Sequence, residues 1–113
     1  MHELSVTESI VGIVVRHAQG AQAKRVLRIH LALGELSSIV DDSVQFYFDF
    51  VSQGTLAQGA ELVFTRVPLQ LTCGACGHAW HPESADWTCP ACHVAQARVA
   101  AGREFYVESI EVE

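Results

Sequence analysis

The sequence is short of positive charge, with 7 Lys and Arg residues against 13 Asp and Glu and a net charge of −6. Proteins that bind nucleic acid usually present a basic surface, so this shortage argues against an RNA or DNA partner. Long apolar runs are missing too: the longest, residues 10–15, is interrupted by Gly12 and is far too short to cross a bilayer. No Lys or Arg precedes this run as in a secretory signal. We therefore expect a cytoplasmic protein with reduced thiols that binds neither nucleic acid nor a membrane.

Arrangements of residues that carry catalysis are missing as well. We find no Ser-His-Asp set, no glycine loop of the kind that cradles phosphate, and no convincing pair of carboxylates. Asp41 and Asp42, an adjacent acidic pair, are most simply explained as the cap of a helix. The sequence therefore favours a binding protein over an enzyme.

Only four cysteines are present, in two pairs, Cys73-Gly-Ala-Cys76 and Cys89-Pro-Ala-Cys92, separated by twelve residues. Two thiolates three positions apart reach one ion from a tight turn, and two such turns supply the closed tetrahedral sulfur shell of a structural Zn(II). Four thiolates leave no open position for an activated water, so a catalytic zinc is disfavoured. A segment of about thirty residues buries too little surface to fold alone, so the metal is expected to supply its folding energy.

Other uses of four cysteines fit this sequence less well. Two disulfides require an oxidising compartment, for which no secretory signal is seen. A thioredoxin-like redox motif opens a helix after a strand, and the glycine- and proline-rich turns here do not offer that context. The ligands of iron–sulfur clusters usually occur in denser runs. A thiol redox protein and a zinc-ribbon adaptor are nevertheless the two rival hypotheses to be tested.

Hydrophobic periodicity predicts two helices. Apolar residues recur at helical spacing over residues 6–18, and Ser5 fits the first position of a capping box. A second helix of about a dozen residues would be capped by Asp41 or Asp42 and ended by Gly54. Four of the five phenylalanines lie between residues 46 and 64, which predicts the main core in this region.

Three segments have the alternating pattern of strands, namely residues 25–33, 61–67 and 104–112. The second and third bracket the cysteine segment, so the last strand is expected to return to the earlier ones. The sequence therefore predicts an α+β fold, in which two helices pack on a small, about three-stranded β-sheet. Residues 1–68 and 103–113 would form this domain, and residues 69–102 an inserted four-cysteine zinc-ribbon domain.

Met1-His2-Glu3 is a second candidate metal site. A free α-amine, the following peptide nitrogen and the His2 imidazole can close five- and six-membered chelate rings around one ion. That planar, nitrogen-rich geometry suits Ni(II) or Cu(II), and Glu3 could add a carboxylate or its backbone nitrogen. Taken alone, these residues are better explained by an exposed terminus without metal.

The combination of motifs resembles the HypA/HybF family, nickel metallochaperones of [NiFe]-hydrogenase maturation. The shared features are Met1-His2-Glu3 before an amphipathic helix, Gly34-Glu35-Leu36-Ser37 after a strand, and Cys-x2-Cys-x12-Cys-x2-Cys near the end. The resemblance covers essentially the whole chain. It implies a nickel-binding domain of two helices on a small sheet, with a zinc ribbon inserted before the last strand.

The resemblance also implies site residues and partners. Nickel would bind Met1, His2 and Glu3, and zinc would bind the four cysteines. His78 and His93 stand just beyond each cysteine pair, where family members can have histidines. The implied partners are a GTPase accessory protein for nickel insertion and the precursor of the hydrogenase large subunit. Some members also support urease maturation, and a homodimer is compatible with the sequence.

Overall fold

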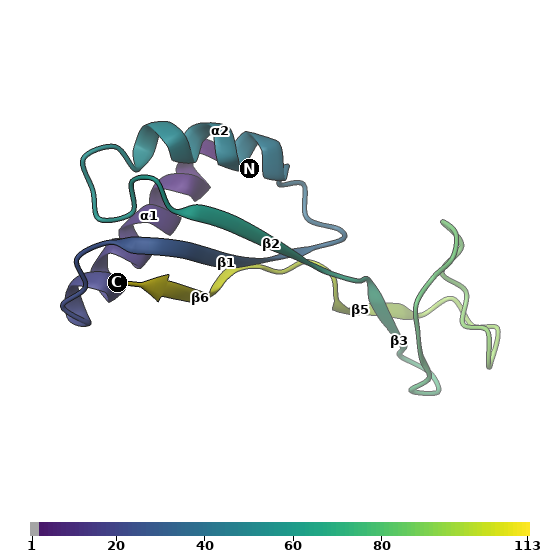
Figure 1. The fold of residues 1–113 in the computed structure, drawn as a ribbon. Coiled ribbons are helices and arrows are strands. Elements are labelled where there is room, and N and C mark those ends of the chain that lie inside the picture. Colours follow the sequence, from purple (N-terminus) through teal and green to yellow (C-terminus); the bar gives the residue numbers. More distant parts are fainter. Residues whose placement is uncertain (1–2) are drawn as a thin grey trace. The chain divides into compact units, whose positions relative to one another are not determined.

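The protein is represented by a computed structural model, in which residues 3–113 are described (Figure 1). The chain divides into two compact units. The first, here called the helical unit, comprises residues up to Ala32 together with Ser38–Thr65 and Phe105–Glu113. The second, the cysteine unit, comprises Leu33–Ser37 and Arg66–Glu104. Each unit is therefore assembled from stretches that lie apart in the sequence. Within the described residues, neither helix is long and apolar enough to span a membrane.

The helical unit is built on two helices and a three-stranded sheet, which confirms the predicted α+β fold. The elements in chain order are α1 (Glu3–Gly20), β1 (Val26–Gly34), α2 (Asp41–Val51), β2 (Glu61–Val67) and β6 (Phe105–Val112). The strand order is β2-β1-β6, so β1 lies in the middle of the sheet (Figure 1). The last strand thus returns to the earlier ones, as the sequence predicts.

Backbone hydrogen bonds at both ends of β1 show its direction relative to β6. Near the start of β1, Lys24 N–H donates to the carbonyl of Glu113, beyond the end of β6 (2.7 Å). At the end of β1, Gly34 N–H donates to the carbonyl of Glu104, just before β6 (2.7 Å). The two strands are therefore antiparallel.

Helix α1 buries one face and leaves the other in solvent. Its buried apolar residues fall on one face of the helix: Ile10, Val11, Val14 and Ala18. The capping box predicted at Ser5 is wrong, because the helix already includes Glu3. Ser5 instead lies inside the helix, where its carbonyl accepts a hydrogen bond from the Ser9 hydroxyl (3.1 Å).

Helix α2 differs from its prediction at the cap and in its aromatic residues. Val40 is the N-cap and makes no side-chain cap bond, so neither acidic residue caps the helix. Asp41 and Asp42 lie in the first turn, where their charge favours the positive end of the helix dipole. The helix buries Val44 and Phe48. The predicted aromatic core is therefore only partly right, because other phenylalanines of this region face solvent.

The cysteine unit contains a second three-stranded sheet. Its strands are β3 (Gln70–Cys73), β4 (Ala79–Trp80) and β5 (Ala97–Ala101), and both neighbours of β3 are antiparallel to it. Leu71, which pairs with Trp80 on one side and Val99 on the other, is fully buried. The sequence did not predict any of these three strands. The unit has so few large buried side chains that its core is small.

Candidate metal centre

The first cysteine turn follows directly from strand β3. Cys73, the last residue of β3, donates its N–H to the carbonyl of His78 (2.8 Å), and Gly77 donates back to the carbonyl of Cys73 (2.9 Å). Gly77 has φ of 79°, a left-handed conformation that glycine adopts without strain. The turn brings the side chains of Cys73 and Cys76 to one side and leads the chain into β4.

The second cysteine turn repeats this construction. Cys89 donates its N–H to the carbonyl of Val94 (3.2 Å), and His93 donates to the carbonyl of Cys89 (2.9 Å). The donor-to-acceptor spacings in the sequence are the same as in the first turn. His93 occupies the place that Gly77 has there, and it too is left-handed, with φ of 62°. Two equivalent backbone loops therefore present the two cysteine pairs.

The four sulfur atoms form one compact cluster. Cys73 Sγ lies 3.6 Å from Cys92 Sγ, Cys76 Sγ lies 3.6 Å from Cys89 Sγ, and all four atoms lie within 4.8 Å of one another. In a tetrahedral zinc site, bonds of about 2.3 Å place the sulfur atoms about 3.8 Å apart. The cluster therefore has the size of a four-thiolate metal site.

Local hydrogen bonds and mutual repulsion determine how readily these thiols ionise. The N–H groups of Cys76 and Ala75 are directed at Cys73 Sγ and lower the pKa of this thiol to about 6. At Cys92 the N–H of Val94 acts in the same direction, but burial and the neighbouring sulfur atoms outweigh it and raise the pKa to about 12. Four thiolates this close together repel one another. A bound divalent cation would remove that repulsion, so the donor set fits a cation.

The histidines next to the cysteine turns do not belong to the sulfur cluster. His78 stacks on Trp80 with ring centroids 5.9 Å apart and an angle of 11° between the planes. His93 and His78 are both exposed. Among residues 3–113, the four cysteines form the only group of three or more His, Cys, Asp or Glu side chains close enough to share an ion. The geometry thus separates the histidines from the sulfur ligands.

The Gly34-Glu35-Leu36 segment joins distant parts of the cysteine unit. Glu35 N–H donates to the carbonyl of Val67 (2.9 Å), and its side-chain Oε2 accepts a bond from Leu69 N–H (2.5 Å). Leu36 N–H donates to the carbonyl of Gly102 (2.7 Å). A Cβ at Gly34 would lie 2.2 Å from the same carbonyl oxygen, so only glycine fits. The motif holds the chain where it enters and leaves the cysteine unit.

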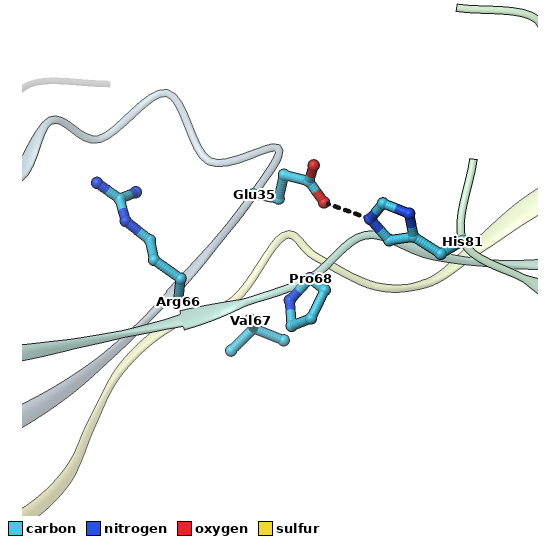
Figure 2. A pocket seen from close by; sticks show the side chains of 5 residues that line it. All are labelled: Glu35, Arg66, Val67, Pro68 and His81. Carbon is cyan, nitrogen blue, oxygen red and sulfur yellow. Dashed lines mark ion pairs between the residues drawn. The ribbon is translucent and has the colours of Figure 1, made fainter. Parts of the chain in front are cut away.

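A pocket of about 440 Å³ opens beside Glu35 (Figure 2). Val67 and Pro68 line it together with Arg66 and His81. The Glu35 carboxylate points toward the His81 imidazole, with Oε2 and Nε2 3.4 Å apart. Both side chains are about half exposed. The sequence predicted neither this contact between Glu35 and His81 nor the pocket, and Glu35 was singled out only as part of the Gly34-Glu35-Leu36-Ser37 motif.

The amino-end residues are placed only in part. Glu3 is the first residue of α1. Met1 and His2 lie outside the described residues. The predicted nickel ligands therefore stay a prediction.

Comparison with known proteins gives matches over the whole chain. The family described as "Hydrogenase/urease nickel incorporation, metallochaperone, hypA" matches residues 1–112. The hydrogenase maturation factor HypA of Dehalococcoides mccartyi is 44% identical over 113 residues, which are 100% of this chain and 95% of that protein. The hydrogenase maturation factor HybF of Shigella boydii is 40% identical and is covered completely, as is this chain.

Two solved structures are similar as well. A solution structure of HypA has a TM-score of 0.81 at 27% identity, and the match covers 100% of this chain and 97% of that one. The solution structure of the nickel metallochaperone HypA from Helicobacter pylori has a TM-score of 0.73 at 27% identity, with coverage of 99% and 97%.

Proposed function

The chain belongs to the HypA family of hydrogenase and urease nickel-incorporation metallochaperones, and on this premise we propose that it carries Ni(II) during the maturation of [NiFe]-hydrogenase. In this proposal the nickel is bound at the amino end and Zn(II) is held by the four cysteines. The observation that supports it most is that family membership extends over the whole chain, including the amino end and the cysteine cluster.

The proposed nickel site consists of Met1, His2 and Glu3. The α-amine, the His2 peptide nitrogen and its imidazole supply the planar donor set that Ni(II) prefers, with Glu3 as a further donor. All of these donors come from three consecutive residues at the beginning of the sequence, so the site can be dismantled without unfolding the rest of the chain, as a carrier requires. Cu(II) should bind there more tightly than Ni(II) in vitro, following the Irving–Williams order. Selectivity in the cell then depends on metal availability and on the partner.

The proposed zinc site has the opposite character. Four thiolates complete the coordination shell, so zinc is not exchanged during transfer and instead stabilises the cysteine unit. The sulfur–sulfur distances of 3.6 Å between Cys73 and Cys92 and between Cys76 and Cys89 support this assignment. The partners we propose are a GTPase accessory protein, which assists nickel insertion, and the precursor of the hydrogenase large subunit, which receives the metal. The carrier itself catalyses no reaction.

Metal analysis of purified protein tests both sites together. The full chain is prepared with a native amino terminus, and nickel and zinc per chain are measured for wild type and His2→Ala. We expect one zinc in both proteins and loss of nickel in the variant. His17→Ala, at an exposed histidine in the last turn of α1, is the matched control and should keep both metals.

The same measurement separates the rival hypotheses. Nickel retained by His2→Ala would refute the amino-end site and favour a zinc-ribbon adaptor without nickel transfer. A protein without zinc that shows a reversible thiol–disulfide couple would favour the redox hypothesis.

A further inference from the structure

Two phenylalanines form an apolar patch on the outer side of helix α2. Phe46 is 59% exposed and Phe50 is 63% exposed, the largest exposures of any big apolar side chain in the described chain. Their rings are in edge-to-face contact, with centroids 5.7 Å apart, and Phe46 makes a second such contact with Tyr47 at 5.4 Å. The two rings thus support each other as one feature on the surface.

The position of this patch follows from the helix period. Val44 and Phe48 are buried and hold α2 on its own unit. Phe46 and Phe50 are four residues apart on the other side of the helix, so the core that takes Phe48 cannot also take them. Single exposed apolar residues are ordinary on protein surfaces, whereas adjoining aromatic rings are the side chains most enriched at interfaces. The patch is therefore best explained by something that covers it.

The charged residues of helix α2 are all acidic. Asp42 and Asp49 fall on the same helix face as the two phenylalanines, and both are exposed. Asp49 also lines a shallow hollow of about 180 Å³ between Phe46, Phe50 and Gln53. Residues 29–65 contain neither Lys nor Arg. A second copy of the chain would bring acidic residues against acidic residues, so the complementary surface is one that carries basic side chains.

We propose that this surface, formed by Phe46, Phe50, Asp42 and Asp49, docks into an apolar groove bordered by Lys or Arg on the GTPase accessory protein. The inference rests on the proposed function for the existence of that partner. The receiver of nickel must reach the ion at the amino end, whereas the protein that assists transfer can bind elsewhere on the carrier. A helix that inserts aromatic anchors into a groove is a common mode of recognition. Two anchors support the modest affinity of a partner that binds and leaves in each cycle.

The test measures binding of purified GTPase accessory protein to the full-length, zinc-loaded chain by calorimetry. The double variant Phe46→Ser, Phe50→Ser should raise Kd about 100-fold, since each buried aromatic anchor typically changes affinity tenfold or more. Tyr106→Ser is the matched control, because Tyr106 is an aromatic residue of β6 with 50% exposure. It should leave Kd unchanged. Nickel and zinc content and the circular dichroism spectrum should be those of wild type in both variants.

A second pair of variants tests the charge. Asp42→Asn with Asp49→Asn should slow association several-fold at low salt, and the difference from wild type should vanish at high salt. The phenylalanine variant should instead speed dissociation, since truncated anchors act mainly on that rate.

Several results would overturn the assignment. In the binding measurement, these are an unchanged Kd for the double phenylalanine variant, an equally raised Kd for Tyr106→Ser, or no binding of the wild-type protein to the GTPase. In sedimentation, the contradicting result is that the wild-type protein self-associates and the double phenylalanine variant does not. Loss of binding only to the hydrogenase precursor would also refute it. Failure of the proposed function is seen separately, because nickel content and its dependence on His2 are measured without any partner.

Discussion

The residue after each cysteine pair must adopt a left-handed backbone conformation, and the conformational strain of doing so differs between the two turns. Gly77 and His93 occupy equivalent places in the two cysteine turns, and both have a left-handed φ, 79° and 62°. Glycine tolerates this conformation, whereas a residue with a Cβ is strained in it. The second turn therefore stores strain that the first does not.

Substitution at the two places should have opposite effects. We expect His93→Gly to stabilise the zinc-loaded protein by about 1 kcal/mol, because it removes the left-handed strain. Gly77→Ala should destabilise it by about the same amount, since it introduces that strain into the first turn. Thermal unfolding and the rate of zinc loss to a chelator provide the measurement. A destabilising effect of His93→Gly would mean that the imidazole makes a contact more valuable than the relief of strain.

At the scale of elements, charged side chains link the three strands of the helical unit. Arg28 of β1 donates to Glu61 of β2 (2.7 Å) and to Glu111 of β6 (2.9 Å), and His30 Nε2 lies 2.6 Å from Glu111 Oε2. The hydrogen bond with His30, and then that with Arg28, lower the pKa of Glu111. These side chains are partly exposed, so the network is screened by solvent and adds little stability.

The network gives the helical unit a small dependence on pH. A carboxyl group whose pKa is lower in the folded than in the unfolded chain stabilises the fold above its unfolded pKa, and this contribution is lost as the pH falls through the folded pKa. We therefore expect Glu111→Gln to be slightly less stable than wild type at neutral pH, with the difference disappearing in acid. Urea unfolding followed across this range measures it. Glu108→Gln, an exposed residue of the same strand, should show no such difference.

Elements with a clear pattern of residue spacing in the sequence could be predicted, and features that depend on packing could not. The faces of α1 and the positions of the cysteine turns follow from spacing along the chain. Strand β4 has two residues and β5 reads Ala-Arg-Val-Ala-Ala, so neither carries a clear alternating pattern. Phe46 and Phe48 could not be distinguished by composition, because only the packing of α2 decides which ring is buried.

The candidate sites also differ in how far local sequence could predict them. The clustering of the four cysteines could be predicted from sequence because both members of each pair lie in one turn. The contacts of Glu35 could not, since its side chain bonds Leu69, 34 positions along the chain, and faces His81. No local pattern encodes such a contact. The proposed ligands at the amino end were accessible only through their chemistry and the family resemblance.

At the scale of the whole molecule, the two units should respond differently to metal removal. Both tryptophans, Trp80 and Trp87, lie in the cysteine unit, whereas both helices lie in the helical unit. If zinc supplies the folding energy of the cysteine unit, removal of zinc should unfold it and leave the helices in place. We expect tryptophan emission to shift to the red after chelation while the helical circular dichroism signal is largely kept.

Both signals should recover when zinc is added back under reducing conditions. Cys73→Ser, which removes one ligand, should reproduce the chelated state without a chelator. Simultaneous loss of the tryptophan and helical signals would contradict the independence of the two units and show that they unfold cooperatively.

The four cysteines alone do not reveal a practical property of the cysteine unit: it cannot be moved into another protein as one continuous fragment. Because Leu33–Ser37 belongs to it, a continuous fragment such as residues 69–102 would carry every sulfur atom yet leave behind the Glu35 carboxylate that accepts from Leu69 and the Leu36 amide that donates to Gly102. A chimera that exchanges this ribbon between relatives must also transplant those five residues. A ribbon exchanged without the segment around Gly34 would lose both contacts.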